Sequence, residues 1–385
     1  MKKNVYVVID GQAGSCGKGK VCAEFALENK PELAITNNMP NAGHTCVING
    51  QKRIFRNIPV SSVNPNTTLL MGAGSVIDME VLEQEYENNI DLVAGREIIA
   101  HPNIPIIEDW HKEEEKLKLK AGSTFKGGGS CLANKIMRPS DLKRFKGYKS
   151  IRVVSYDEYY KVLKEYLLKA KKILIEGSQG CDLDINHSGH YPHVTSRQIS
   201  VTQMLADSGI SPKHLKEIIM VIRPFPIRIS NTTNIGKEIY SGNYGKSEEL
   251  SWPQINIASE IGSYPIVIDE VDIANHEGES IKDFTEYTTV TQQKRRVFDI
   301  DICQLQRNIQ INTPDSIYLN FFQQLDNIYE NIKGSTIDFN QGEVYFNRYL
   351  REYLYWLENE LNVPITKLGT GAENGSYIKK SLRRN

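Results

Sequence analysis

We predict an α/β fold with a large, mainly parallel β-sheet flanked by helices, and three observations support it. An apolar strand over residues 5–9 leads into a glycine-rich turn and then a helix. Further short apolar runs alternate with helical segments. Polar residues follow these strands where they end, which is where ligand sites form in α/β sheets. The 385 residues are expected to form one elaborated domain, 1–385.

The expected elements follow in chain order. The run at 5–9 is apolar and bounded by glycine, as in a strand buried on both faces. Residues 109–118 are charged and helix-forming, and 157–170 are amphipathic. Residues 122–129 hold four glycines and are expected to form a flexible loop. Strands are expected at 5–9, 33–36, 68–72, 97–100 and 173–175, and helices at 19–28, 109–118 and 157–170.

Composition excludes several classes of protein. The hydrophobic fraction of 40% and charged fraction of 24% are typical of soluble globular proteins. A net charge of −1 gives no bulk attraction to nucleic acid or to membranes, so neither is expected as a partner. No apolar run reaches the ~18 to 20 residues of a membrane helix. The six cysteines form no CxxC pair, which favours reduced thiols in a cytoplasm.

The glycine-rich turn over residues 11–20 predicts a phosphate site. Backbone N–H groups of such a turn, and the helix N-terminus after it, bind anions. The turn ends in GKGK and lacks the GxxxxGK[ST] order of an ordinary P-loop. A simple strand-to-helix turn is the alternative, but repeated glycines and lysines after a clean strand favour a polyphosphate cradle.

Two further segments carry candidate site residues. His44 lies in a polar turn after a strand, and its near-neutral pKa suits proton transfer or hydrogen bonding to a phosphoryl group. A structural histidine is the alternative. Gln179 follows the strand at 173–175 and therefore lies at the usual site edge, although the residue alone slightly favours a plain loop amide.

These segments together resemble the adenylosuccinate synthetase family. Residues 14–20 resemble its GDEGKGK loop, 41–45 match NAGHT, 176–196 resemble EGAQG…LDIDHG…YPYVTSS, and 288–296 resemble TTGRxRR. The similarity runs from residue 5 to about 378, where 368–373 resemble the TGPDR strip beside the donor base. It implies a P-loop-related fold and a two-step reaction. A nucleoside triphosphate phosphorylates the 6-oxygen of IMP, and the aspartate amine then displaces that phosphate.

The resemblance also implies site residues. Catalysis is assigned to Ser15, Lys18, His44 and Gln179, and the acceptor nucleotide to Ser15, Asn41, Thr124, Arg138, Gln179, Thr195 and Ile229. Aspartate is assigned to Thr288, Thr289, Thr291, Gln293 and Arg295. The donor is assigned to Gly14, Gly17, Lys18, Gly19, Lys20, Gly43, His44, Thr45, Arg295, Gln323 and Gly371, and Mg²⁺ to Ser15 and Gly43. Thr124 and Arg138 stand fourteen residues apart, as in the family, where the arginine is lent by a partner subunit. A homodimer with a shared site follows.

Three departures resemble the phage branch of this family, whose members join aspartate to dGMP. Ser15 replaces the catalytic aspartate, Gln323 replaces an aspartate that reads guanine on GTP, and Gln293 replaces an arginine near the ribose and the amino acid. Serine is smaller and leaves room for the 2-amino group of guanine, but its hydroxyl is a poor base. The N1 proton then leaves through Ser15 or through a water beside it.

A glutamine amide both donates and accepts, which suits adenine N1 and N6, so the expected donor is ATP or dATP. Loss of the two hydrogen bonds between guanine and the family's aspartate, which Gln323 replaces, should weaken GTP binding by ~1 to 3 kcal/mol. The expected product is 2-amino-2′-deoxyadenylosuccinate, a precursor of 2-aminoadenine DNA. The alternatives are an ordinary IMP-specific synthetase and an inactive nucleotide-binding regulatory protein. Relative turnover of IMP and dGMP separates the first, and ADP release that needs both dGMP and aspartate excludes the second.

Overall fold

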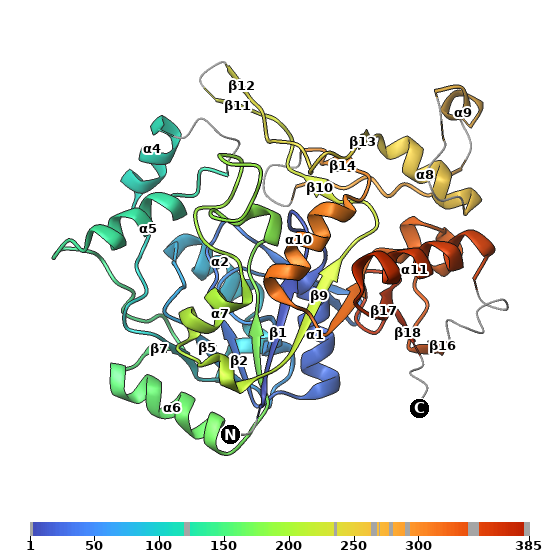
Figure 1. Ribbon diagram of the computed structural model, residues 1–385. Helices are drawn as coiled ribbons and strands as arrows, with labels where there is room; N and C mark the ends of the chain where they lie inside the picture. Colours follow the sequence, from blue (N-terminus) through green and yellow to red (C-terminus); the bar gives the residue numbers. More distant parts are fainter. Residues whose placement is uncertain are drawn as a thin grey trace.

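The centre of the protein is an eleven-stranded β-sheet in a computed structural model that describes residues 3–118, 124–234, 237–262, 268, 270–276, 280–288, 293–337 and 346–380 (Figure 1). Neighbouring strands pair in parallel except β17 and β18, which are antiparallel. The predicted α/β class with a mainly parallel sheet is therefore confirmed. In sheet order the strands are β16 (Ser335–Ile337), β18 (Tyr377–Lys380), β17 (Ile365–Gly369), β15 (Ser316–Leu319), β9 (Leu215–Ile222), β1 (Val5–Asp10), β8 (Ile173–Glu176), β2 (Leu33–Thr36), β5 (Thr68–Met71), β6 (Ile98–Ala100) and β7 (Ile151–Val153).

Both faces of this sheet are buried, which explains why its strands are apolar throughout. Along β1, Val5, Val7 and Ile9 belong to one core cluster and Val8 to the other. Helices α6, α7, α10 and α11 supply the first cluster, and α1 and α2 supply the second. The described helices are α1 (Lys18–Asn29), α2 (Met79–Asn88), α3 (Ile90–Val93), α4 (Asp109–Lys118), α5 (Gly128–Met137), α6 (Tyr156–Leu168), α7 (Val201–Ser208), α8 (Trp252–Ile261), α9 (Glu270–Asn275), α10 (Ile302–Asn312) and α11 (Arg348–Leu361).

Local capping fixes where many helices begin. The side chains of Asp78, Ser155, Ser200, Asp301 and Asn347 each accept a hydrogen bond from an N–H in the first turn of their helix. Short 3₁₀ helices occupy Val60–Val63, Cys181–Leu183, Pro212–His214, Phe322–Gln324 and Asn327–Tyr329.

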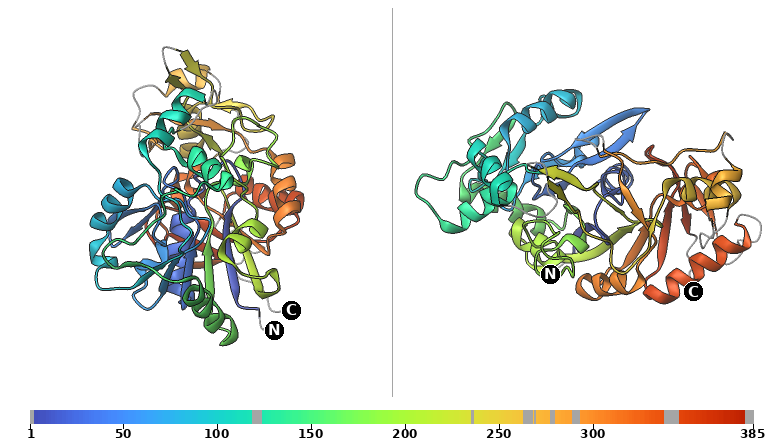
Figure 2. Two further views of the ribbon diagram at one scale, coloured as in Figure 1. Left: turned by 90° about the vertical axis from the view of Figure 1, so that its left-hand side faces the viewer. Right: turned by 90° about the horizontal axis from the view of Figure 1, so that it is seen from above.

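Smaller elements lie outside the central sheet, and those labelled β10 to β14 lie above the carboxyl ends of the parallel strands in Figure 1. They are the hairpin β3 (His44–Ile48) with β4 (Gln51–Phe55), the sheet β10 (Ile227–Arg228), β14 (Arg296–Phe298) and β13 (Glu249–Leu250), and the pair β11 (Thr232–Asn234) with β12 (Lys237–Ile239). Seen from above in Figure 2, the teal helices α4 and α5 lie at one end and the orange-red α11 at the other.

The predicted strands at 5–9, 33–36, 68–72, 97–100 and 173–175 are all present within a residue of the expected ends. Two local predictions are wrong. The glycine-rich segment 122–129 is not all loop, because α5 begins at Gly128. His44 is not in a turn but is the first residue of β3, paired with Phe55.

Candidate active site

The phosphate loop (residues 11–17) connects β1 to α1 through an unusual backbone. Gly14, Ser15 and Gly17 have φ of 93°, 58° and 84°. Positive φ is easy for glycine and uncommon for serine. A side chain at residue 17 would place its Cβ 2.1 Å from Asn320 Nδ2, so glycine is required there. Contacts with neighbouring residues hold the Ser15 backbone at this positive φ, and strained backbone of this kind is common at functional sites.

Arg223 helps to hold the backbone of the phosphate loop at Ser15. Its Nη1 donates to the Ser15 carbonyl (3.2 Å), and its own backbone N–H and C=O both bond the Gln12 side-chain amide (2.9 and 3.0 Å). The guanidinium is buried, pairs with Glu286 and lies over the Phe321 ring. Ser15 itself lines a cavity of about 660 Å³ at the carboxyl edge of the sheet.

Lys18 and His44 line the same cavity. Lys18 Nζ lies 3.2 Å from Asp10 Oδ2, and both groups are buried. Burial, with a smaller effect of the Lys18 charge, lowers the pKa of His44 to about 3. Neither ring nitrogen makes a hydrogen bond within the described residues. The near-neutral pKa expected for His44 is therefore wrong: the imidazole is neutral and suits hydrogen bonding to a phosphoryl group rather than proton donation.

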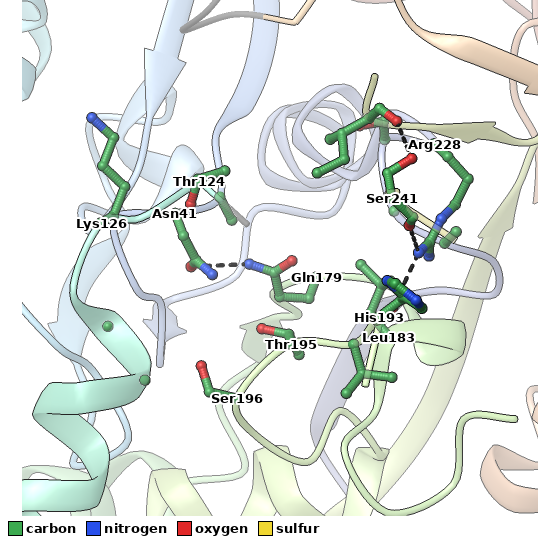
Figure 3. A pocket seen from close by; sticks show the side chains of 18 of the residues that line it. Asn41, Thr124, Lys126, Gln179, Leu183, His193, Thr195, Ser196, Arg228 and Ser241 are labelled. Carbon is green, nitrogen blue, oxygen red and sulfur yellow. Dashed lines mark hydrogen bonds between the residues drawn. The ribbon is translucent and has the colours of Figure 1, made fainter. Parts of the chain in front are cut away.

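Gln179 and Asn41 meet in the middle of the cavity (Figure 3). Gln179 has a φ of 61° and donates from Nε2 to Asn41 Oδ1 (3.0 Å). An amide nitrogen carries two hydrogens, so the second one remains for a ligand, as does the Gln179 carbonyl oxygen. The structure thus brings together the ends of β2 and β8, as their parallel pairing requires.

One side of the cavity carries groups suited to phosphate. Thr195 is buried, and its hydroxyl has no partner in the described part of the chain. Figure 3 places Thr124 and Asn41 on one side of Gln179, with Thr195 and Ser196 below. Near Thr124 begins α5, whose first N–H groups are occupied by the Glu115 carboxylate. A buried hydroxyl without a partner needs one, and a ligand oxygen would supply it.

The opposite side is formed by Arg228, Ser241 and His193 (Figure 3), and Ile229 also lines the cavity. Arg228 donates from Nη2 to the carbonyls of His193 (3.1 Å) and Ser241, and burial lowers its pKa to about 10. Ser241 in turn donates to the Ile229 carbonyl (2.6 Å). These bonds fix the shape of this wall.

The predicted aspartate segment reaches the cavity in part. Thr288, Gln293 and Arg295 line it, and the Gln293 N–H bonds Thr288 Oγ1 (3.0 Å). Thr289 and Thr291 lie outside the described residues. Predicted residues that do line the cavity are Gly14, Ser15, Lys18, Asn41, Gly43, His44, Thr124, Gln179, Thr195, Ile229, Thr288, Gln293 and Arg295.

Other predicted residues lie elsewhere: Gly17, Gly19, Lys20, Thr45, Arg138, Gln323 and Gly371 do not line the cavity. The Lys20 side chain is buried against Tyr318 OH (3.1 Å) and the Ser376 carbonyl (2.8 Å), and the assignment of Lys20 to the donor stays a prediction. Gly19 packs α1 on β3, because a Cβ there would lie 2.5 Å from the Thr45 carbonyl. Arg138 is exposed at the end of α5.

Several residues in and under this site were missed from the sequence. Asp10, Arg223 and Arg228 are charged residues at the ends of apolar runs, which was a usable signal. Glu115 and His193 gave none, because their positions depend on contacts with distant segments.

Charge in the cavity favours anionic ligands. Of the described residues that line it, the basic ones are Lys18, Arg56, Lys118, Lys126, Arg228 and Arg295, whereas the acidic ones are Glu114 and Glu115. Both glutamates are already bonded, Glu114 to Ser130 and Lys118, and Glu115 to the start of α5. The cavity therefore suits substrates that carry phosphates and carboxylates.

Mg²⁺ prefers oxygen ligands, and Ser15 and Gly43 offer two neutral oxygens on the cavity wall. Among the described residues, no group of three or more His, Cys, Asp or Glu side chains could hold a metal. The donor set thus fits an ion held mainly by phosphate oxygens and water, with Ser15 and Gly43 completing its shell.

A phosphate loop, a basic cavity and a neutral imidazole at the carboxyl edge of a parallel sheet define a nucleotide-using enzyme. The chain belongs to the adenylosuccinate synthetase family, whose sequence profile matches residues 7–146 and 140–336. It is a carbon–nitrogen ligase that joins aspartate to a purine nucleotide. The predicted family and enzyme class are confirmed.

Relatives come from two branches. The N6-succino-2-amino-2′-deoxyadenylate synthase of Vibrio phage phiVC8 is 32% identical over 336 residues, covering 84% of this chain and 87% of that protein. The adenylosuccinate synthetase of Thermococcus sibiricus is 29% identical over 387 residues, covering 99% of each. The solved PurZ of cyanophage S-2L, bound to dGMP and to dATP as energy donor, superposes with a TM-score of 0.76 at 26% identity, covering 100% of this chain and 97% of that one. The Plasmodium falciparum adenylosuccinate synthetase shares the fold, with a TM-score of 0.75 at 20% identity over 98% of this chain and 100% of that one.

In the described parts of the chain, no helix combines the length and apolar character needed to cross a membrane.

Proposed function

We propose that the protein ligates L-aspartate to C6 of dGMP, with ATP or dATP as phosphoryl donor, and releases 2-amino-2′-deoxyadenylosuccinate, a precursor of 2-aminoadenine DNA. The observation that carries the proposal is Ser15, whose backbone is fixed and whose side chain lies on the cavity wall where the family has a catalytic aspartate. A serine leaves space beside guanine N1 for the 2-amino group. An aspartate would fill that space and bring a charge.

The reaction runs in two steps. The 6-oxygen of guanine attacks the γ-phosphorus, the bond to the β–γ bridging oxygen breaks, and ADP or dADP leaves. The N1 proton passes through the Ser15 hydroxyl to water. The aspartate amine then attacks C6, the C6–O6 bond breaks, and phosphate departs with that oxygen. The amine gives its extra proton to solvent.

The cavity groups stabilise the charge that develops. Lys18 faces the 6-oxygen and the transferring phosphoryl group with a fixed ammonium, and the second Gln179 amide hydrogen donates to the same 6-oxygen. The neutral His44 donates one hydrogen bond to the phosphoryl oxygens. Mg²⁺ held at Ser15 and Gly43 would neutralise phosphate charge. Because Ser15 is a weak base, we assign most of the rate to this charge stabilisation.

We place the acceptor nucleotide and the aspartate in different parts of the cavity. We place the 5′-phosphate at Thr124, Asn41 and Thr195, where the Thr195 hydroxyl lacks a protein partner. The sugar then lies near Ile229, and aspartate lies between Thr288, Gln293 and Arg295. Arg295 supplies the positive charge for a substrate carboxylate or the terminal phosphate of the donor.

The base of the donor lies behind the phosphate loop, outside the cavity, beside Gln323 and Gly371. The buried side-chain Oε1 of Gln323 makes no hydrogen bond within the described residues. Such an acceptor suits the 6-amino group of adenine, whereas guanine offers an oxygen there that would repel it. This supports ATP or dATP over GTP.

A homodimer completes the site. Arg138 ends α5 next to Ile136 and Met137, whose side chains are 74% and 77% exposed. Exposed apolar side chains beside a cation suit a subunit interface. We propose that Arg138 reaches the 5′-phosphate in the partner subunit, and that the enzyme works in the cytoplasm, where its substrates are made.

Product analysis tests the proposal. Purified protein with Mg²⁺, aspartate and either ATP or dATP is incubated separately with IMP, dIMP, GMP and dGMP, and product masses are recorded. We expect the succino product of dGMP to form fastest. Faster conversion of IMP would make this an ordinary adenylosuccinate synthetase, and no nucleotide-dependent ADP release would make it an inactive binding protein.

A further inference from the structure

We infer that Asp10 is a positioning residue of the phosphate loop: its carboxylate fixes the loop from beneath and holds Lys18 at the cavity wall. The inference rests on the proposed function only in taking a nucleoside triphosphate as the loop's ligand. Asp10 ends β1, is fully buried and does not line the cavity. It therefore acts through the groups that it bonds and does not touch substrate.

Those groups surround both carboxylate oxygens. Oδ1 accepts the N–H groups of Gln12 (3.0 Å) and Gly14 (3.3 Å) and also the Cys16 thiol (3.1 Å). Oδ2 accepts the Cys16 N–H (3.0 Å) and the Lys18 ammonium (3.2 Å). A buried carboxylate is costly unless paired and hydrogen-bonded, and this one is both.

The pattern decides which loop amides can meet a ligand. The N–H groups of residues 12, 14 and 16 point to Asp10, so they cannot bind phosphate. Those of Ser15 and Gly17 make no hydrogen bond in the part of the chain that the structure describes. Asp10 thus selects alternate amides, and leaves Ser15 N, Gly17 N and the first amides of α1 for an anion.

The bond to Asp10 fixes the Lys18 ammonium and still leaves it able to bind a ligand in the cavity. An ammonium has three hydrogens, and Asp10 takes one. The others remain for the cavity, which Lys18 lines. Between residues 10 and 20, Asp10 is the one acidic residue, since Ser15 and Cys16 stand where GDEGKGK has two acids. The negative charge lies under the loop here, away from the phosphates and from the purine edge.

Binding of Mg²⁺ with a non-hydrolysable ATP analogue tests this, because it does not depend on which acceptor the enzyme uses. Asp10→Asn keeps the shape and one oxygen but turns an NH₂ toward Cys16 N–H and Lys18. We expect analogue binding to weaken roughly 10- to 100-fold, as for lost hydrogen bonds to charged groups. The matched control is Asp182→Asn. Asp182 is another buried carboxyl beside the loop, bonded to Asn308 and not to Lys18. Because Asp182→Asn leaves the Lys18 contact intact, this variant should bind the ATP analogue with an affinity within about threefold of wild type.

A double-mutant cycle with Lys18→Met separates positioning from mere stability. If Asp10 acts through Lys18, adding Asp10→Asn to Lys18→Met should weaken analogue binding further by much less than it does in wild type. Full additivity, or wild-type binding by Asp10→Asn, would overturn the inference. Should Asp10→Asn alone fail to fold, by circular dichroism, the double variant removes both buried charges and is compared with Lys18→Met. Further weakening of less than about tenfold supports the inference, and weakening of about tenfold or more overturns it.

Discussion

Ser15 is the side chain on which the choice of acceptor depends in this account. Its φ of 58° and its bond to Arg223 leave it little freedom to move aside. Ser15→Asp restores the family's base but presses a charged, larger group against the 2-amino edge. We expect kcat/KM for dGMP to fall roughly 10- to 100-fold, the usual effect of overpacking by about 1 to 3 kcal/mol, with turnover of IMP or dIMP unchanged or higher.

Ser15→Ala is the control for that variant, because it keeps the space and removes only the hydroxyl. It should retain the preference for dGMP at a lower rate. Faster dGMP turnover by Ser15→Asp would sink the steric account and mark the serine as a tolerated loss.

Lys18 and His44 are assigned to the transferring phosphoryl group. We expect Lys18→Ala and His44→Ala each to lower kcat by ~10²- to 10³-fold, as for loss of a preorganised donor, with unchanged circular dichroism. His187→Ala is the matched control, since His187 is exposed and does not line the cavity. If either variant keeps more than about a tenth of the wild-type rate, the role assigned to that residue is wrong.

Asp182 gives the protein a pH-dependent stability. Burial raises the pKa of this carboxyl from 3.8 to about 7. Between those values the folded protein holds a proton that the unfolded chain has released, so this contribution is complete below about pH 4 and is lost as pH rises through 7. The free energy of unfolding of Asp182→Asn, relative to wild type, should therefore increase from pH 5 to pH 8, by at most about 1.4 kcal/mol per pH unit.

Urea denaturation of both proteins at four pH values measures the difference. The Asn308 bond to Oδ1 can persist in the variant, and Oδ2 has no partner to lose within the described residues. A difference that stays flat or falls with pH would show that Asp182 is ionised in the folded protein.

Helix α5 is the element that we assign to the subunit interface. Arg138→Ala subunits lack the arginine that a neighbour needs, and Lys18→Ala subunits lack their own catalytic group. Mixing the two inactive proteins should restore partial activity, because some hybrid sites receive both residues. At random exchange about a quarter of all sites are intact, which sets the ceiling of recovery.

Subunit exchange is shown first with a differently tagged copy of each protein. No recovery despite proven exchange would mean that each site uses residues of its own chain alone.

The same helix shows what the sequence could not predict. Glycines at 127–129 indicate a loop, because glycine is a poor helix former. The helix begins there because Glu115 of α4 accepts the N–H groups of Gly127, Gly129 and Ser130, a contact between separate helices that no local pattern reveals. The strands were predictable, since each is apolar and buried on both faces.

Part of the candidate site was also predictable from the sequence. Motif spacing identified Ser15, Lys18, Asn41 and Gln179, which the structure gathers around one cavity. It gave the wrong state for His44, whose pKa depends on burial in the folded protein. It could not show that the Lys20 side chain packs against Tyr318, because that contact joins segments far apart in the sequence.

The protein as one body brings three anionic substrates to the carboxyl edge of an eleven-stranded sheet. Parallel pairing of β1, β2 and β8 sets the phosphate loop, Asn41 and Gln179 side by side, and later segments supply the opposite wall. A single domain over residues 1–385 stays a prediction. The basic lining explains how the cavity can hold anionic substrates, and we propose that Ser15 decides which purine enters.

Internal competition between dGMP and IMP tests this account most directly. Equal concentrations of both nucleotides are mixed with the wild-type enzyme, aspartate, Mg²⁺ and ATP, and the two succino products are counted by mass at low conversion. Their ratio equals the ratio of kcat/KM values. We expect the product of dGMP to dominate by at least about tenfold, the effect of roughly 1.4 kcal/mol in the transition state. An excess of adenylosuccinate would contradict the account.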